Sequence, residues 1–238
     1  MIILKKAFTL AEVLITLGII GIVAALTLPT LITRYQQEAL RTALLKNYTA
    51  ISQALQHMSA DLGTDVVPKN FAQQGFKEQF MPYFKVLYDC GLGSTDITDR
   101  ENAKKYCPSE QHYTETINRY SEHYKIFSGT KYLDPTLLNN GQFALMDGSL
   151  IMIENWSENE LYISVDVNGI TKRPNVWGKD LFTFQLTSKG KLLPMGAQGT
   201  TYHDADDTYC SKDSNNTYNG VACTYKAITD KNYFKNNL

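Results

Sequence analysis

The sequence lacks the short motifs that mark common catalytic and nucleotide-binding sites. It contains no G-x-S-x-G, P-loop, G-x-G-x-x-G or H-E-x-x-H segment. Its four histidines are scattered along 238 residues, at His57, His112, His123 and His203. A formal net charge of −1 produces no overall field that would attract nucleic acid or an anionic membrane surface. These absences argue against an enzyme, and they predict neither a cofactor nor a nucleic-acid partner.

Long apolar runs are also absent, except at the start of the chain. The segment Ala7–Thr33 carries one charged residue, Glu12, among its 27 residues. Because about 20 helical residues cross a hydrocarbon core of about 30 Å, a helix over Phe8–Leu28 can span a membrane once. A conventional signal peptide has a shorter apolar region that ends in a small-residue cleavage site. Here Pro29 and then an amphipathic segment follow directly, so a retained single-pass helix is expected.

Glu12 is the informative residue of this apolar segment. A carboxylate placed in a membrane-spanning helix costs about 2.5–3.5 kcal/mol on insertion scales, so such residues are usually paired or functional. One interpretation places Glu12 near the membrane interface, where it reaches back toward Lys5 or Lys6. The other gives the carboxylate a partner outside its own helix.

The residues around Glu12 resemble the prepilin processing motif of type IV pilins and type II secretion pseudopilins. That motif consists of basic residues, a small residue, Phe, Thr, Leu, any residue, Glu, and then an unbroken apolar helix. Residues 5–14, KKAFTLAEVL, follow this order, and Pro29 also falls where many such pilins have a proline. The small residue is Ala7, where the family usually has Gly.

The resemblance implies three properties of the N-terminus. A prepilin peptidase would cut between Ala7 and Phe8 on the cytoplasmic side, after the basic residues Lys5 and Lys6. The new amine of Phe8 would be methylated. Glu12 would then meet the Phe8 ammonium of a neighbouring subunit within a filament, which agrees with the need of a buried carboxylate for a counter-charge.

Beyond the apolar segment, the pattern changes to that of an amphipathic helix. Over Tyr35–Leu62, apolar residues recur every three or four positions, which places them on one face; they are Leu40, Leu44, Tyr48, Ile51, Leu55, Met58 and Leu62. Gly63 is a typical residue for the end of such a helix. Together with the apolar segment, this predicts one helix of about 55 residues, roughly 80 Å long. A further short helix is expected around Lys77 to Leu87.

Strand patterns begin after Gly141. Turn dipeptides such as Asp147–Gly148 and Asn168–Gly169 separate apolar or alternating runs, which is typical of hairpins. The expected strands are 142–146, 149–154, 160–167, 181–187 and 191–193. The predicted fold is therefore α+β and pilin-like, with a long N-terminal helix packed on an antiparallel sheet of four to five strands. The stretch 166–184 also resembles, more loosely, sheet regions of some bacterial pilin-like proteins.

These patterns predict three consecutive segments with different roles. Residues 1–7 are expected to be a leader peptide, and residues 8–33 a transmembrane and assembly helix. Residues 34–238 are expected to form a soluble, pilin-like globular domain.

The four cysteines form two local pairs, Cys90 with Cys107 and Cys210 with Cys223. An even number of cysteines in an exported chain favours disulfides, and four cysteines allow three connectivities. The two local pairs are the preferred prediction, and each would stabilise the fold by roughly 3 kcal/mol in the chain-entropy model. Four reduced, buried cysteines are the alternative. The spacing of cysteines and histidines does not suit a zinc site.

The segment His203–Asp207 contains three aspartates within four positions. Oxygen-rich clusters can hold calcium, and some pseudopilins hold calcium. A solvated loop is the alternative, because no full set of ligands such as an EF-hand loop is present. Calcium is therefore the one cofactor considered, and no other metal site is predicted.

The sequence as a whole points to a structural subunit of a type IV pilus or type II secretion pseudopilus. Its expected location is the bacterial inner membrane, with the soluble part outside the cytoplasm, and later a pilus or pseudopilus in the periplasm or at the cell surface. Its expected partners are prepilin peptidase, an inner-membrane assembly platform and other pilin-like subunits. The alternative is a single-pass, membrane-anchored binding module that does not polymerise. The sequence does not separate a pilus, a secretion pseudopilus and a DNA-uptake fibre.

Overall fold

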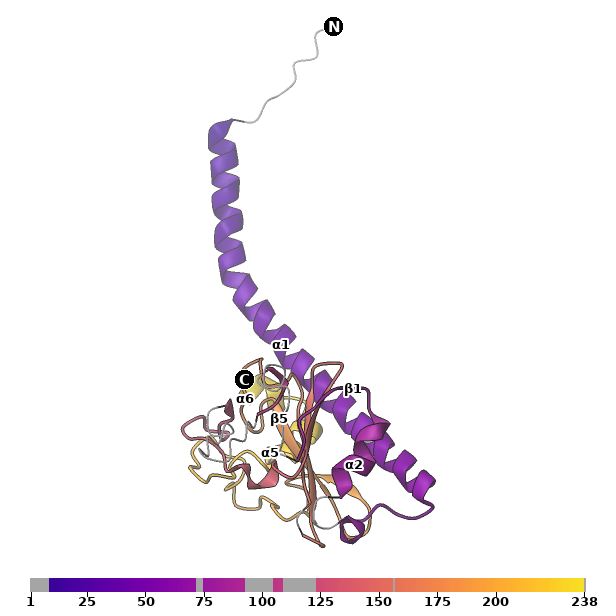
Figure 1. The fold of residues 1–238 in the computed structure, drawn as a ribbon. Helices are drawn as coiled ribbons and strands as arrows, with labels where there is room; N and C mark the ends of the chain where they lie inside the picture. Colours follow the sequence, from indigo (N-terminus) through magenta and orange to yellow (C-terminus); the bar gives the residue numbers. More distant parts are fainter. Residues whose placement is uncertain (1–8, 72–74, 93–104, 109–122, 156, 238) are drawn as a thin grey trace, which may run out of the picture. The chain divides into compact units, whose positions relative to one another are not determined.

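The computed structural model describes residues 9–71, 75–92, 105–108, 123–155 and 157–237 (Figure 1). Contacts within the chain divide it into two units, a first unit Met1–Ala39 and a second unit Leu40–Leu238. The division lies after Ala39, and it groups residues by contacts without regard to their roles. The expected leader (residues 1–7), assembly helix (8–33) and globular domain (34–238) therefore remain proposals.

One long helix, α1 (Leu10–Leu62), contains almost all described residues of the first unit and the beginning of the second. It ends at Gly63, which has a left-handed φ of 65° that glycine adopts without strain. In the second unit, the predicted apolar stripe is buried at Leu44, Ile51, Leu55 and Met58. The stripe is shorter than predicted, because Leu62 in the last turn is 45% exposed.

The second unit contains a six-stranded antiparallel sheet whose strands follow one another in chain order. The predicted α+β class with a long helix on an antiparallel sheet is confirmed, but the predicted number of four to five strands is too low. The strands are β1 (Val86–Asp89), β2 (Gln142–Leu145), β3 (Leu150–Glu154), β4 (Leu161–Asp166), β5 (Leu181–Leu186) and β6 (Leu192–Pro194).

The additional strand, β1, occupies part of the segment expected to be a helix. The helix α2 covers only Phe76–Phe80, followed by the 3₁₀ helix η2 (Met81–Tyr83). Pro82 lies within η2, and proline has no N–H to continue an α-helix. The chain then becomes extended and pairs with β2 at the edge of the sheet.

One face of the sheet packs against the second-unit part of α1 (Figure 1). The ring of Tyr48 stacks on that of Phe184 in β5, with centroids 5.2 Å apart. Nearby, Ser149 Oγ donates a hydrogen bond to Asn47 Oδ1 at 3.2 Å. Helix and sheet therefore share one core, as the apolar stripe predicted.

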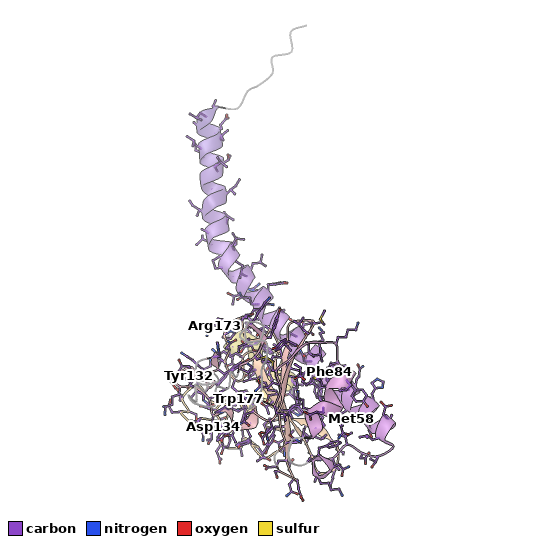
Figure 2. All side chains as sticks on the ribbon, in the orientation of Figure 1. Met58, Phe84, Tyr132, Asp134, Arg173 and Trp177 are labelled. Carbon is purple, nitrogen blue, oxygen red and sulfur yellow. A yellow bond between two sulfur atoms is a disulfide. The ribbon has the colours of Figure 1, made fainter. Side chains whose placement is uncertain are left out.

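The opposite face of the sheet carries several polar residues that are nevertheless buried. Ser164 and Thr183 lie opposite each other on β4 and β5, and their hydroxyls are 2.7 Å apart. Trp177, labelled in Figure 2, is fully buried, and its indole Nε1 donates to Thr183 Oγ1 at 3.0 Å. The loop between β4 and β5 and the C-terminal segment cover this face, so its polar groups bond to protein rather than to water.

Short helices complete the second unit. The 3₁₀ helices η1 (Pro68–Asn70) and η3 (Pro135–Leu137) lie in the connections, and α5 (Cys223–Thr229) and α6 (Tyr233–Asn237) end the chain. Phe234 of α6 contacts Phe182 of β5 edge to face, with ring centroids 5.9 Å apart. The C-terminal segment is therefore part of the core and not a free tail.

Candidate assembly and processing site

A capping box begins α1 at the position of the processing motif. The backbone N–H and the hydroxyl of Thr9 both donate to Glu12 Oε2, each at 2.8 Å. In return, the N–H of Glu12 donates to Thr9 Oγ1 at 3.3 Å. This reciprocal pair satisfies N–H groups that the first helical turn leaves without partners, and it places a negative charge at the positive end of the helix dipole.

The cap uses only half of the Glu12 carboxylate. Both bonds from Thr9 end on Oε2, and Oε1 has no hydrogen-bond partner among the residues that the structure describes. The side chain is exposed, so Oε1 can still accept a hydrogen bond from a cation outside the chain. The motif can therefore fix the helix start and present a carboxylate oxygen at the same time.

The helix that follows the cap is apolar on all sides. Its large side chains between positions 10 and 32 are more than 40% exposed; they are Leu10, Val13, Leu14, Ile15, Leu17, Ile19, Ile20, Ile22, Val23, Leu26, Leu28, Leu31 and Ile32. A helix with apolar residues around its whole circumference is normally surrounded by lipid or by other protein. By length and composition, α1 is the one helix among the described residues that could cross a membrane.

Threonine hydroxyls bond to backbone carbonyls of this helix on both sides of its proline. Pro29 lies within α1 and cannot donate the usual helical hydrogen bond. The hydroxyls of Thr27 and Thr33 donate to the carbonyls of Val23 and Pro29 at 2.9 and 3.0 Å. The carbonyl that the missing N–H of Pro29 leaves without its helical donor is that of Ala25, so these bonds satisfy the threonine hydroxyls within an apolar helix and do not replace the lost backbone bond.

Four of the predicted site residues, Lys5, Lys6, Ala7 and Phe8, lie outside the described residues. The cleavage point and the methylated amine therefore remain predictions. Glu12 is described, and its closest bonds are to Thr9, a residue to which sequence reasoning gave no role. The signal that could have revealed it is the spacing of Thr and Glu three residues apart before an apolar run, which is the capping-box pattern.

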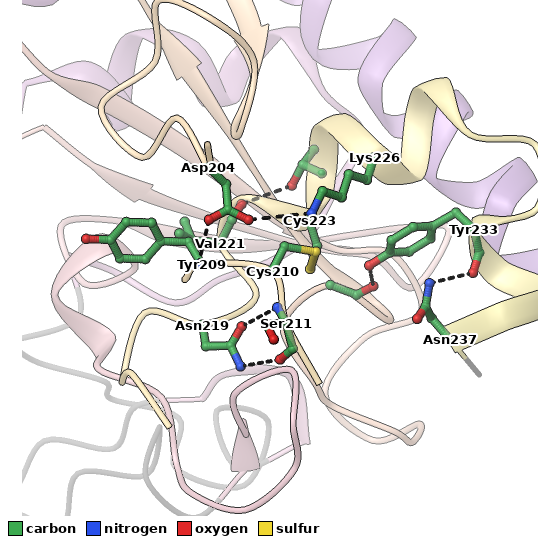
Figure 3. Close-up of a disulfide and its surroundings, with 12 residues drawn as sticks. Asp204, Tyr209, Cys210, Ser211, Asn219, Val221, Cys223, Lys226, Tyr233 and Asn237 are labelled. Atoms are coloured by element: carbon green, nitrogen blue, oxygen red, sulfur yellow. Dashed lines mark hydrogen bonds and ion pairs between the residues drawn. A yellow bond between two sulfur atoms is a disulfide. The ribbon is translucent and has the colours of Figure 1, made fainter. Parts of the chain in front are cut away.

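Two disulfides join the local cysteine pairs that the spacing favoured. Cys90 is bonded to Cys107, and Cys210 to Cys223, with Cα atoms 5.7 and 4.9 Å apart. The second bond lies in the packed interior of the C-terminal segment (Figure 3). A Cβ placed on Gly178 would come within 2.8 Å of Cys223 Sγ, so the chain requires glycine at this close approach.

Two of the three aspartates in the 203–207 segment lie near a lysine. Lys226 Nζ lies 3.6 Å from Asp204 Oδ2 (Figure 3) and 2.7 Å from Asp207 Oδ1. The hydrogen bond from Lys226 holds the pKa of Asp207 below its ordinary value. Asp204 also accepts a hydrogen bond from the N–H of Tyr209 at 2.8 Å. An ammonium group already supplies positive charge to this cluster, which weakens the argument for calcium there.

The described residues contain no group of three or more His, Cys, Asp or Glu side chains arranged to hold a metal ion. Of the described histidines, His57 and His203 lie far apart in the sequence, in α1 and in the C-terminal segment, and His123 lies before the strands β2 to β6. At the N-terminal end of the described chain, Thr9 and Glu12 cap α1, and the apolar side chains that follow are suited to contact with lipid or other protein.

Comparison with known families agrees with the capped, apolar N-terminal helix. A sequence model of the prokaryotic N-terminal methylation motif matches residues 4–28, and this is the prepilin-type motif of type IV pilins and pseudopilins. No curated protein and no solved structure matches the chain.

Proposed function

We propose that this chain is a structural subunit of a type IV pilus or type II secretion pseudopilus, which polymerises through its N-terminal helix. The carrying observation is the prepilin-type motif at residues 4–28, followed directly by a helix with apolar side chains exposed on every side. The motif and the apolar helix indicate a membrane-anchored, pilin-like protein. The assembly into a fibre is the proposed step beyond that.

The apolar helix would have apolar surroundings both before and after assembly. In the membrane, lipid surrounds the exposed side chains of α1, and in a fibre the same side chains would pack against the helices of other subunits. A carboxylate at Glu12 costs free energy in both settings unless a cation meets it. The Phe8 ammonium of a neighbouring subunit would meet that need, with Glu12 Oε1 as the acceptor.

In this proposal, residues 1–7 are the leader, residues 8–33 the transmembrane and assembly helix, and residues 34–238 the soluble domain outside the cytoplasm. Prepilin peptidase would remove the leader, and an inner-membrane platform would extract the mature subunit into the growing fibre. The role is structural and not catalytic. The two disulfides in the second unit favour, mildly, a pilus-type subunit exposed to an oxidising compartment.

The alternative function is a membrane-anchored binding module, with α1 as a plain anchor. The mature N-terminus distinguishes the two. Intact-mass measurement of the membrane form, with and without prepilin peptidase, should show cleavage after Ala7 and a methylated Phe8. The matched variant Ala7→Gly should be processed at least as well, and Ala7→Trp should block trimming, since the small residue has to enter the peptidase groove. A native chain that still begins at Met1 in the presence of active peptidase contradicts the proposal and supports the anchor.

A further inference from the structure

Two aspartates lie at adjacent positions where the loop between β4 and β5 begins and ends. Asp166 is the last residue of β4, and Asp180 directly precedes β5. The sheet register pairs Asp166 with Leu181, which brings Asp180 next to it. Both side chains are fully buried, although aspartate is rarely buried without a partner of opposite charge. Folding therefore removes two neighbouring acidic groups from water.

Asp166 accepts three hydrogen bonds. Its Oδ1 accepts from the N–H groups of Asn168 and Gly169 in the loop, at 3.2 and 2.8 Å. Its Oδ2 accepts from the hydroxyl of Tyr124, which lies outside the loop, at 2.6 Å. Burial raises the pKa of Asp166, and the bond from Tyr124 is the largest of the effects that oppose this rise. Because both oxygens have donors, Asp166 is the member of the pair that is suited to carry a negative charge.

Asp180 is suited to keep its proton. Its two oxygens accept one N–H each, from Asn175 and Val176, both at 2.7 Å, and the side chain of Asn168 also bonds to it. Burial raises the pKa of Asp180, and the negative charge of Asp166 raises it further. Like charges at adjacent positions shielded from water oppose the ionisation of the second carboxyl.

No positively charged side chain neutralises the pair. Among the residues that the structure describes, no lysine or arginine forms a salt bridge with either aspartate. Lys172, which is exposed, lowers the pKa of Asp166 only through its charge at a distance. Lys125, in the segment that pairs with the loop, has its Nζ over the ring of Tyr132 instead. The residues in register with Asp166 on the neighbouring strands are apolar; they are Leu150 and Leu181.

Two amide oxygens show that the site has more acceptors than donors. The Oδ1 atoms of Asn168 and Asn175 are buried and form no hydrogen bond with the described residues. Their Nδ2 groups donate to the carbonyls of Arg173 and Ile170, at 3.3 and 2.8 Å. Buried acceptors without a donor are uncommon in native proteins. A proton on Asp180 supplies one more donor where the side chain of Asn168 meets it, whereas two charged carboxylates supply none.

We propose that Asp166 and Asp180 form a proton-dependent latch, in which a proton on Asp180 keeps the loop between β4 and β5 closed and its loss at higher pH opens the loop. Hydroxide takes the proton as water, which leaves two adjacent carboxylates without a counter-charge. The loop carries Trp177, whose indole donates to Thr183 Oγ1 at 3.0 Å in the closed state. Opening therefore exposes Trp177. The latch does not depend on polymerisation, so it can be tested separately from the proposed function.

The direction of the pH dependence follows from the raised pKa values. A carboxyl whose pKa is higher in the folded than in the unfolded chain keeps its proton longer when folded. Its contribution to stability is present in full below the ordinary pKa of 3.8 and is lost as the pH rises through the folded pKa. The latch should therefore weaken as the pH rises from about 5 to about 9.

Thermal melting of the full-length, oxidised protein in detergent micelles over this pH range tests the latch. The chain has two tryptophans, so Trp156→Phe leaves Trp177 as the sole reporter of the loop. We expect the melting temperature to fall by about 4 °C or more between the two ends of the range. We also expect acrylamide to quench Trp177 increasingly as the pH rises, while the far-UV circular dichroism at room temperature stays constant.

Asp166→Asn is the decisive variant. Its Oδ1 can still accept the two loop N–H groups, and the hydroxyl of Tyr124 can turn to accept from the new Nδ2 group. It removes the charge and keeps the bonds, so the fall in melting temperature should shrink to about half or less. Asp180→Asn should also shrink the fall, but it should melt lower at every pH because it loses an acceptor for one loop N–H.

Two matched controls separate the latch from other titrating groups. Asp206→Asn replaces an exposed aspartate in another loop and should leave the fall unchanged. His123 precedes Tyr124 in the chain, and histidine titrates in the same pH range. The comparison of the native chain with Asp166→Asn is therefore repeated with His123→Gln in both, and the difference between them should persist.

Three results would overturn the proposal. One is a native melting temperature that stays constant or rises from about pH 5 to about pH 9. Another is an equal fall in the native chain and in Asp166→Asn, because the dependence then belongs to other groups. The third is a Trp177 that stays shielded from acrylamide throughout, because the pair then titrates without opening the loop. If Asp166→Asn does not fold, the slope of Asp180→Asn and the quenching of Trp177 decide.

Discussion

The capping box allows the two roles of Glu12 to be separated by mutation. Glu12→Gln keeps an oxygen that can accept from the N–H and hydroxyl of Thr9, because glutamine serves in capping boxes as well as glutamate. It removes only the charge. Thr9→Ala does the opposite, since it removes the hydroxyl from the cap and leaves the charge of Glu12 intact.

The expected magnitudes differ enough to be measured. Loss of an N-cap side chain typically costs about 1 kcal/mol, which is roughly a fivefold effect on an equilibrium. Removal of one member of a buried charge pair costs about 3–5 kcal/mol, which is roughly two to four orders of magnitude. Because a fibre repeats the contact at every subunit, Glu12→Ala should abolish fibres. Glu12→Gln should leave few, and Thr9→Ala should reduce them only modestly.

The assay compares sheared fibres, counted by electron microscopy, with the amount of trimmed protein in the membrane fraction of the same cells. Thr9→Ser, which preserves the hydroxyl, is the matched control and should resemble the native chain. All variants should be inserted and trimmed, because the apolar residues of α1 suffice for insertion without the Glu12 carboxylate. Equal losses of fibres from Glu12→Gln and Thr9→Ala would refute the charge-pair explanation and show that the cap is what assembly requires. Normal fibres from Glu12→Ala would favour the anchor function.

Two further predictions concern the second unit. Burial alone would raise the pKa of Asp147, but hydrogen bonds from Lys46 and Ser149 outweigh it, and the pKa lies below its ordinary value of 3.8. The stability that the charged Asp147 contributes is present above about pH 4 and is lost as the pH falls through the folded pKa. The difference in melting temperature between the native chain and Asp147→Asn should therefore shrink in acid. A difference that grows below about pH 4 would contradict the assignment. The ion pair between Lys46 and Asp147 should contribute less than about 1 kcal/mol to the free energy of unfolding, since the Lys46 side chain is 60% exposed. Replacing Cys210 and Cys223 together with alanine should lower the free energy of unfolding by about 3 kcal/mol, measured by denaturant titration, and an unchanged midpoint would show that the disulfide does not restrain the unfolded chain.

Most of the fold could be predicted because its signals are local. The stripe of α1 follows the helical period, and turn residues such as Gly148 and Gly190, both at positive φ, separate the strands. The strand β1 was missed because its four residues follow an aromatic spacing of four that favours a helix, and the effect of Pro82 on that helix was overlooked. An edge strand of this kind depends on its neighbour, since β2 is the one strand among the described residues that pairs with it.

The buried polar face of the sheet could not be predicted from the strands alone. The alternation in β4 correctly separated Ile163 and Val165 from Tyr162 and Ser164, but it did not indicate what covers the polar side. The structure covers that side with segments that come later in the chain, and Tyr162 bonds to Thr201 at 3.1 Å. A period of two reports which residues share a face, and it contains no information on what a distant segment places over that face.

The same limit explains why the burial of Asp166 and Asp180 was not predicted from the sequence. The two residues are separated by a loop, and only the pairing of β4 with β5 brings them together. Asn168 was interpreted as a turn residue, which accounts for its backbone and not for its buried Oδ1 atom. A turn needs no buried carboxylates, and a stable core needs none either, because apolar residues of similar volume would avoid the cost of desolvation. What these carboxyls do in the fold is accept backbone N–H groups of the loop, from Asn168 and Gly169 to Asp166 and from Asn175 and Val176 to Asp180, and these bonds fix the connection between β4 and β5.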